Sequence, residues 1–381
     1  MKPKTQAIKS KIQNHKEPKT KQKVNLKLEL CPLFPHILII FISIILSSSV
    51  LASGTASQIN SKARLAIGYD SNVSDKVNDP LKSNFLQLYI NSDFNLYPTT
   101  KSSLAINIQD GLKYHDAKSL SNESILINSM DLCFTHKITE HLTPDICGEI
   151  RSRTSMHSRS QIISSEESYM RGNAGVALKA MIFSDISSRV FLNYKATNFE
   201  DFDPFDRRGY EFGCKTNIRL LPNAFINFQY SREKMNFNKW DDEGKLRNDV
   251  TDTINVGGQF YKYLLINFNA SYENNNSNAI GYSYKGYMAS ILMAKAISDK
   301  TTLELYALFR SRKHESSLDE TNSIQIDIED EERNVFITKI SRDIARRVAL
   351  EIQYDLRRNR SGVEGGTYAK NVFSASILSD F

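Results

Sequence analysis

The chain has 381 residues and a formal net charge of +6, with 40% hydrophobic and 24% charged residues. These values are near those of ordinary globular proteins, so composition alone does not indicate a membrane protein. The excess charge lies in residues 1–52, which hold nine Lys and two Glu, and the remainder carries 40 basic and 41 acidic residues. Without residues 1–52, the chain gives no electrostatic indication of a nucleic-acid partner.

The first residues have the pattern of a secretory signal peptide. A Lys-rich segment, 2–27, precedes the apolar core 37–46, and Val50 and Ala52 follow as the small residues that signal peptidase requires. We expect a signal peptide over residues 1–52, with cleavage after Ala52 or, as a second site, Ala56. An uncleaved N-terminal anchor is the alternative. Because this is the one continuous apolar stretch, any further membrane spans are expected to be strands.

After a short periplasmic segment, 53–61, residues 62–381 are predicted to form an outer-membrane barrel of about sixteen antiparallel, up-and-down strands, with fourteen to eighteen as the range. The predicted strands, in chain order, are Lys62–Tyr69, Ser83–Tyr97, Lys101–Tyr114, Ser124–His136, Asp145–Met156, Glu167–Phe183, Ser188–Phe199, Arg208–Leu221, Asn223–Asn236, Val250–Tyr261, Leu264–Glu273, Gly281–Ile297, Thr301–Lys313, Arg333–Arg342, Arg346–Arg357 and Thr367–Phe381.

Alternation of apolar and polar residues supports these strands. Leu86, Leu88 and Ile90 alternate with Gln87 and Tyr89, and the same period of two recurs in later segments. Such a period predicts a strand with one apolar and one polar face. Three segments alternate poorly and are included because they fill the expected positions: 124–136, 281–297 and 333–342.

Short and long connections alternate along the chain between the predicted strands. Short ones are predicted at 98–100, 184–186, 222–223, 298–300 and 343–345, with less regular ones near Glu140 and Tyr263. Longer polar loops lie between them, such as 70–82, 237–249 and 314–332. Outer-membrane barrels have short periplasmic turns and longer outer loops, so both termini are expected in the periplasm. A β-propeller or sandwich is the structural alternative, but a propeller blade would place four short strands where two long ones are predicted.

Aromatic residues fall near both ends of the predicted strands, where interfacial girdles belong. Those near the short turns are Phe94, Tyr97, Phe134, Phe183, Phe260 and Tyr263, and those near the long loops are Tyr69, Tyr114, Tyr194, Tyr230, Tyr272 and Tyr354. The last strand ends in Phe381, with Ile377 and Phe373 on the same face. This ending resembles the C-terminal signal that the barrel-insertion machinery reads, although Ser379 stands where an apolar residue is usual.

The polar faces of the strands predict a charged lumen. The candidate lumen-lining residues are Asp93, Glu149, Arg151, Arg153, Lys215, Arg219, Glu304, Arg310, Arg312, Glu351, Asp355 and Arg357. They fit a water-filled channel whose opposed charges shape a transverse field. The alternative is a closed lumen filled by ion pairs.

Cys133 and Cys147 lie at equal distances from Glu140 on the predicted lumen face. A cross-strand disulfide between them suits the oxidising periplasm, but the geometry is demanding, so free thiols stay open as the alternative. Cys214 would then have no disulfide partner. Acidic loops over 200–206 and 319–332 are interpreted as solvated surface rather than calcium sites, so neither a metal nor a cofactor is expected.

No catalytic motif is recognised. The sequence has no Gly-x-Ser-x-Gly, no His-Glu-x-x-His and no phosphate-binding loop. No predicted strand places a Ser–His pair on the lipid-facing side near the outer rim, as a lipid-hydrolysing barrel would require. We therefore expect no enzyme, and a lipid-modifying barrel remains the second alternative function.

Three segments resemble the β-barrel porin 2 family. They are Gly68-Tyr69-Asp70-Ser71-Asn72-Val73, the run from Tyr354 to Ser361, and Tyr368-Ala369-Lys370-Asn371. The resemblance covers roughly residues 62–381 and rests on short, turn-like motifs. It implies an outer-membrane barrel, and for some relatives a role in exporting exopolysaccharide.

The sequence thus predicts a porin-like outer-membrane channel that passes polysaccharide or helps to export it. Its expected partners are outer-membrane lipid and lipopolysaccharide, the barrel-insertion machinery and polysaccharide-export proteins, with no nucleic acid. A non-conducting barrel that displays its loops is the first alternative function.

Overall fold

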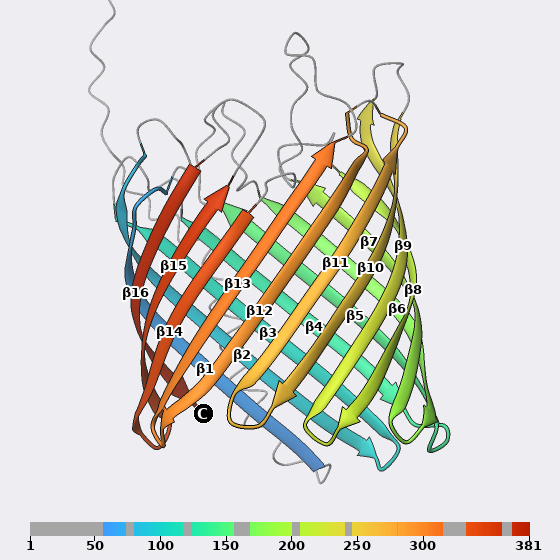
Figure 1. Cartoon of the computed structure of the whole chain (residues 1–381), viewed down its shortest axis with the longest axis horizontal. Coiled ribbons are helices and arrows are strands. Elements are labelled where there is room, and N and C mark those ends of the chain that lie inside the picture. Colours follow the sequence, from blue (N-terminus) through green and yellow to red (C-terminus); the bar gives the residue numbers. More distant parts are fainter. Residues whose placement is uncertain are drawn as a thin grey trace, which may run out of the picture. The chain divides into compact units, whose positions relative to one another are not determined.

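The computed structural model describes residues 56–73, 80–116, 124–155, 168–199, 206–240, 246–279, 281–314, 333–359 and 368–381. They form one closed barrel of sixteen strands, each antiparallel to its neighbours, and β1 pairs with β16 to close the ring (Figure 1). The predicted fold, an antiparallel barrel of sixteen strands, is confirmed. The predicted signal peptide lies outside the described residues. Among the described residues, no helix is long and apolar enough to cross a membrane.

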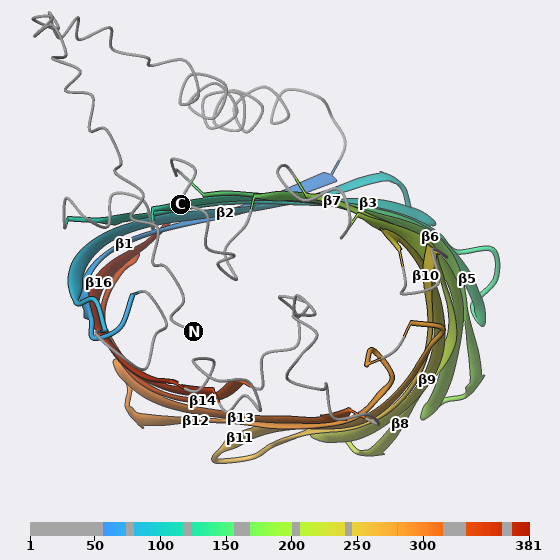
Figure 2. The same ribbon diagram turned by 90° about the horizontal axis from the view of Figure 1, so that it is seen from above.

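The strands follow one another around the ring in chain order. The first eight are β1 (Ala56–Asp70), β2 (Ser83–Thr99), β3 (Ser102–His115), β4 (Ile125–His136), β5 (Leu142–Ser155), β6 (Tyr169–Phe183), β7 (Ile186–Phe199) and β8 (Arg207–Leu221). The second eight are β9 (Ala224–Trp240), β10 (Leu246–Tyr261), β11 (Leu265–Ser277), β12 (Tyr284–Ser298), β13 (Thr301–His314), β14 (Arg333–Ala345), β15 (Val348–Asn359) and β16 (Tyr368–Asp380). Figure 2 looks along the barrel and shows a wall one strand thick.

The strands are 12 to 17 residues long. About 9–11 tilted residues suffice to cross a membrane, so each strand is long enough to span it. Figure 1 shows strands inclined to the barrel axis, with the front and rear strands crossing in projection, as in a closed barrel of tilted strands. The β-propeller and the sandwich, the structural alternatives, do not occur in this part of the chain.

The two ends of the barrel differ in their connections. Short turns follow the even-numbered strands and gather, with the C-terminus, at the lower end in Figure 1. Longer connections follow the odd-numbered strands at the other end. The predicted turn at 343–345 is wrong, because β14 runs on to Ala345 and the turn is formed by the polar pair Arg346 and Arg347.

The barrel begins earlier than the predicted start at Lys62. Residues 56–61 belong to β1 and pair with β2, from Ala56 opposite Tyr97 to Ser61 opposite Ser92. They have no β16 partner, because that pairing ends at Lys62 opposite Asp380. The prediction of a separate segment over 53–61 is therefore wrong for residues 56–61.

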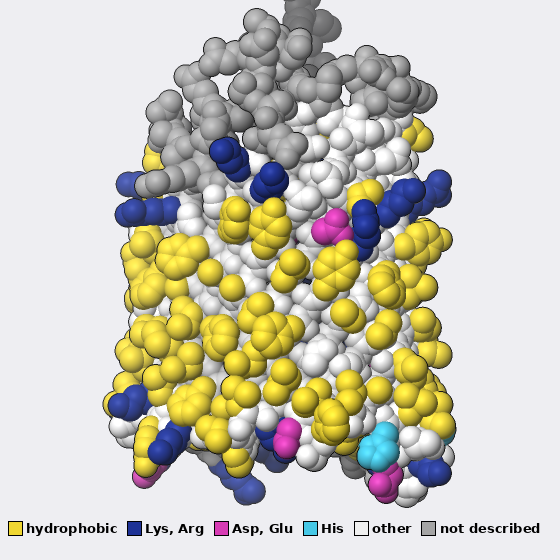
Figure 3. Space-filling model, turned by 45° about the vertical axis from the view of Figure 1, so that its right-hand side comes forward, with side chains coloured by type: hydrophobic (Ala, Val, Ile, Leu, Met, Phe, Trp, Pro, Cys, Tyr) yellow, Lys and Arg dark blue, Asp and Glu magenta, His cyan; other side chains and the backbone are white. Residues whose placement is uncertain are grey.

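The outward face of the wall is apolar. In β7, Val190 and Leu192 are 48% and 47% exposed, and in β15 Ile352 is 54% exposed. These residues alternate with inward-facing polar ones, since successive strand side chains point to opposite sides. Figure 3 shows hydrophobic side chains covering the middle of one side of the barrel, with most of the Lys and Arg above and below them.

Aromatic girdles border this apolar surface at both ends. At the long-loop end, the Tyr194 and Tyr210 rings lie 5.2 Å apart, as do those of Tyr272 and Tyr287. At the short-turn end, Phe183 and Tyr263 are among the most exposed side chains. Phe94 differs from the prediction: it is buried, opposite Ile59 of the β1 extension.

Candidate functional site in the barrel lumen

Alternation places every candidate lumen residue on the inward side of the wall. In β5, for example, Glu149 and Arg151 flank the outward Ile150, and in β15 Glu351 flanks the outward Ile352. The structure thus gives an inward position to the whole set: Asp93, Glu149, Arg151, Arg153, Lys215, Arg219, Glu304, Arg310, Arg312, Glu351, Asp355 and Arg357. Whether they line a conducting path stays a prediction.

Two of these residues belong to one ion-pair chain across the strands that close the barrel. Arg64 Nη2 lies 2.6 Å from Glu351 Oε1, and Lys339 Nζ lies 3.6 Å from Glu351 Oε2. Lys339 also lies 2.7 Å from Glu304 Oε2. Arg64 Nε donates to Ser376 Oγ, whose hydroxyl in turn donates to Glu351. The chain links β13, β14, β15, β16 and β1, so it ties the first strand to the last.

A second closing cluster is centred on Asp70, at the end of β1. Its side chain has no exposed surface, and Oδ2 lies 3.4 Å from Lys113 Nζ and 3.2 Å from Lys370 Nζ. Asp70 Oδ1 also accepts a hydrogen bond from the backbone N–H of Asn72. One buried carboxylate therefore holds β3 and β16 to β1. A buried carboxylate is stable only with such partners.

Elsewhere the inward charges form smaller groups. Glu273 contacts both Arg310 and Arg312, at 4.0 and 3.8 Å. Lys195 bridges Glu211 and Glu233 from β7 to β8 and β9. Asp93 is instead held by amides, because Asn91 and Asn107 both donate to it.

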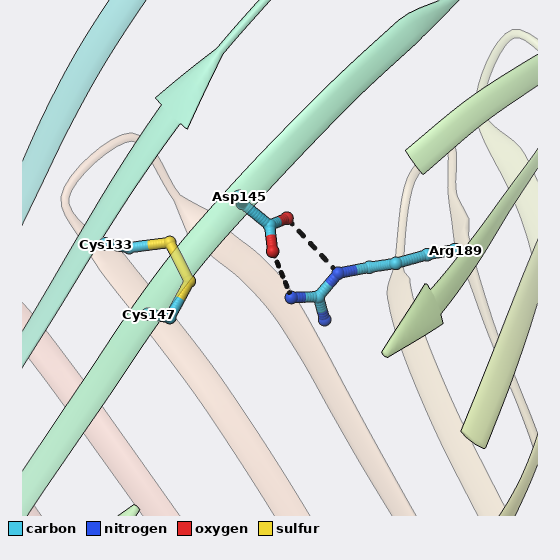
Figure 4. Close-up of a disulfide and its surroundings, with 4 residues drawn as sticks. All are labelled: Cys133, Asp145, Cys147 and Arg189. Carbon is cyan, nitrogen blue, oxygen red and sulfur yellow. Dashed lines mark hydrogen bonds and ion pairs between the residues drawn. A yellow bond between two sulfur atoms is a disulfide. The ribbon is translucent and has the colours of Figure 1, made fainter. Parts of the chain in front are cut away.

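Cations predominate on β5 to β8. Arg151 lies directly opposite Arg171, and Arg189 lies between Lys179 and Lys215 in the register of β6, β7 and β8. Arg189 forms a two-pronged contact with Asp145, with Nη2 2.8 Å from Oδ1 (Figure 4).

The two predicted cysteines are joined in this structure. Cys133 of β4 and Cys147 of β5 are register partners on the inward face, and a disulfide connects them (Figure 4). Cys214 is exposed and has the outward parity of β8. The crosslink borders the cation-rich strands.

A cavity of about 270 Å³ opens in the inner wall, lined by residues of β1 to β5, β15 and β16. Its wall includes Phe85, whose ring atoms Cζ and Cε1 occupy the space beside Gly68, its register partner. A Cβ at position 68 would meet this ring and the Phe373 carbonyl oxygen. Only glycine leaves room for the ring, so Gly68 sets the shape of the wall here.

Several of the interacting residues were not predicted. Arg64, Lys113, Arg171, Lys339 and Lys370 all have the inward parity of their strands, and that parity was the signal that could have found them. The predicted first strand ends at Tyr69, so the prediction places Asp70 in a loop, whereas the structure places it in β1.

At the long-loop rim, Asp116 follows β3 and connects it to β2. Asn84 Nδ2 and Ser83 Oγ donate to its two carboxylate oxygens, at 3.0 and 2.9 Å. These hydrogen bonds hold the pKa of Asp116 below its usual value, and the one from Asn84 has the larger effect.

The residues of the predicted assembly signal lie on the outward side. Phe373, Ile377 and Phe381 are 50%, 51% and 67% exposed. The first two alternate with the buried Ser374 and Ser376 of the lumen wall. Their recognition by insertion machinery stays a prediction.

One Ser–His pair does occur on the outward side. Ser102 Oγ lies 2.9 Å from His136 Nδ1, between register partners of β3 and β4. It lies beside the short turns, and within the described ranges no carboxylate contacts this imidazole. Nor do the described residues contain a cluster of His, Cys, Asp and Glu able to hold a metal ion.

No protein-family model and no curated protein sequence matches the chain, so the resemblance to the β-barrel porin 2 family is not confirmed. Solved structures that are similar include the anion-selective porin from Comamonas acidovorans, with 11% identity and a TM-score of 0.49 over 86% of this chain and 100% of that one. OmpT, an outer membrane protein of Vibrio cholerae, has 9% identity and a TM-score of 0.46 over 86% of this chain and 98% of that one. OprD of Pseudomonas aeruginosa has 9% identity and a TM-score of 0.45 over 85% and 95%. With TM-scores below 0.5, these likenesses assign no function to the chain.

Proposed function

We propose that the protein is an outer-membrane channel of the porin type that passes hydrophilic solutes. The observation that carries the proposal is the separation of the two faces of one closed wall. The outward face is apolar and bordered by aromatic girdles, as lipid contact requires, while the inward face is charged. Barrels of sixteen strands are wide enough to enclose an aqueous path.

The orientation follows from the connections. Short turns and both ends of the barrel sequence gather on one side, which in outer-membrane barrels is the periplasmic side. The longer connections would then face the cell exterior. Polysaccharide is the finer candidate for what passes through, and its support is the sequence resemblance of residues 68–73 and 354–371.

Single-channel conductance of refolded residues 53–381 in planar bilayers tests the channel. We expect stable current steps, and heat-modifiable migration in gels would show independently that the barrel is folded. Folded protein without current steps would contradict the channel and favour a non-conducting, loop-displaying barrel. Current blocks by an added oligosaccharide would support polysaccharide as cargo, and their absence would count against it.

A matched pair of variants identifies the lumen as the path. Ser290 faces inward in β12 and Ile291 faces outward beside it. Ser290→Trp places an indole in the lumen and is expected to lower each current step, whereas Ile291→Trp is expected to leave it unchanged. Equal effects of the two variants would contradict conduction through the lumen.

A further inference from the structure

Three cationic side chains lie side by side on the lumen wall of β6, β7 and β8. In the register of these strands, Arg189 lies directly opposite Lys179 on one side and Lys215 on the other. We call Lys179, Arg189 and Lys215 the basic row. All three have the inward parity of their strands, and residues directly opposite in a sheet have Cβ atoms about 5 Å apart. Their charges therefore act together on one part of the lumen.

One described carboxylate contacts the basic row. Asp145 of β5 lies 2.8 Å from Arg189, whereas neither Lys179 nor Lys215 forms an ion pair with another described residue. Glu211, which follows the inward face of β8 beyond Lys215, contacts Lys195 of β7 instead, at 3.0 Å. The row therefore keeps an excess of positive charge. Cations this close repel one another, so an anion bound between them would lower the electrostatic energy.

Asp145 holds the Arg189 guanidinium in place and leaves part of it for a ligand. Arg189 Nε and Nη2 donate to the two carboxylate oxygens of Asp145, at 3.3 and 2.8 Å (Figure 4). The N–H groups of Nη1 have no acceptor within the described ranges. The Arg189 side chain is 38% exposed, so a solute in the lumen can reach it. A guanidinium already held in position loses less side-chain entropy when it binds a ligand.

Neutral hydrogen-bonding groups continue the basic row on both sides. Thr143 lies opposite Lys179, and Gln229 lies opposite Lys215. Both side chains have the inward parity of their strands. Hydroxyl and amide groups beside the cations suit the uncharged, hydroxylated part of an organic acid. The row lies near the short turn that joins β6 to β7, so its ligand would bind in the short-turn half of the lumen.

We propose that the basic row binds the oxyanion, a carboxylate or a phosphate, of solutes in the lumen. This inference rests on the proposed channel function and adds the class of solute. Guanidinium and ammonium groups bind such oxyanions through charge-assisted hydrogen bonds. A bound oxyanion would also relieve the repulsion between cations that lie directly opposite one another in the sheet.

Calorimetric titration of the refolded barrel in zwitterionic detergent tests the inference. The probes are inorganic phosphate and glucuronate, with glucose as the neutral comparison. We expect both anions to bind and glucose not to bind. Lys179→Gln and Lys215→Gln should each weaken anion binding about tenfold, the loss of one charge-assisted hydrogen bond. Both variants keep the contact between Arg189 and Asp145, and heat-modifiable migration in gels shows that each is folded.

A matched control separates the basic row from general positive charge. Arg171 lies on the same inward face of β6 as Lys179 but eight residues away, which is roughly 26 Å along the strand. That distance exceeds the screening length in physiological salt, so Arg171→Gln should change anion affinity less than about twofold. A loss equal to that of Lys179→Gln would overturn the inference, as would a folded wild-type barrel that binds neither anion.

The two proposals fail in different ways. Anion binding by a folded barrel that conducts no current would refute the channel and leave the basic row standing as a binding site. Current steps from a barrel that binds neither phosphate nor glucuronate would refute the basic row and leave the channel standing.

Discussion

Two sectors of the same inner wall treat charge in opposite ways. In the closing sector, β14–β16 with β1–β3, two buried carboxylates are each shared by two cations: Asp70 by Lys113 and Lys370, and Glu351 by Arg64 and Lys339. In the cation-rich sector, β5–β8, like charges lie directly opposite one another across the register.

We interpret this difference in charge arrangement as a division between residues that stabilise the barrel and residues that serve its function. The closing sector joins the first strand to the last, which are the most distant in the chain, so it must overcome the largest loop-closure entropy. Shared buried carboxylates supply specific contacts there. Like charges directly opposite each other destabilise a sheet, and a protein retains such a conflict where function needs it. We therefore expect that lumen chemistry, rather than closure, has set the residues of the cation-rich sector.

The largest expected effect comes from the centre of the closing sector. Asp70→Asn keeps the volume of the side chain and removes the charge that Lys113 and Lys370 share. Because both cations would then repel each other in the wall, we expect the free energy of unfolding to fall by about 3 kcal/mol. Urea titration of the barrel in lipid vesicles measures it.

Lys179→Gln in the cation-rich sector is the matched control for Asp70→Asn. It removes one inward charge that lies opposite Arg189. We expect its unfolding midpoint to be unchanged or slightly higher, because a like-charge contact is relieved. Equal losses of stability in the two variants would show that the sectors do not differ.

A smaller loss of stability is expected at the border of the cation-rich sector, where a disulfide, rather than a shared carboxylate, joins neighbouring strands. Replacing both Cys133 and Cys147 by Ser should lower the free energy of unfolding by about 2 kcal/mol. This value is at the lower end of the usual range, because the register of β4 and β5 already confines the two residues.

Thiol labelling tests the disulfide directly. Unreduced residues 53–381, unfolded in denaturant, should react at Cys214 alone, and reduction should add two further thiols. Three reactive thiols before reduction would contradict the disulfide.

The alternation of residues was enough to predict the barrel and its strand number, but it failed where the lumen wall itself is apolar. In β12, Met288 and Leu292 face inward, and in β14 Val335 and Ile337 do so. Apolar residues on both faces remove the period of two, so only their position between neighbouring strands predicts these two strands. The register of β12 and β14 with their neighbours is defined only in the closed barrel.

For the candidate site, the sequence predicts which side of the wall each residue faces, but not which residues it contacts. Parity gave inward positions to Glu351 and Arg357, whereas the partner of each depends on which strands become neighbours. The cluster around Asp70 exists because β16 lies beside β1, and no local pattern in the sequence brings Lys370 to Lys113. Asp70 shows a further limit, since a strand boundary misplaced by one residue assigned the central carboxylate of the closing sector to a loop.

The smallest expected effect on stability tests whether residues of the cation-rich sector serve the lumen rather than barrel closure. Arg171→Gln removes one of two arginines that face each other, so we expect the free energy of unfolding to rise by about 0.5 kcal/mol. The same change removes a positive charge from the wall of the channel, so the preference for chloride over potassium, read from the reversal potential in a salt gradient, should fall. Lys295→Gln is the control, because Lys295 is an exposed cation on the outward face of β12. It should alter neither quantity. If Arg171→Gln lowered stability and left the reversal potential unchanged, the facing arginines would be part of the barrel's structural support, and the contrast between the two sectors would not hold.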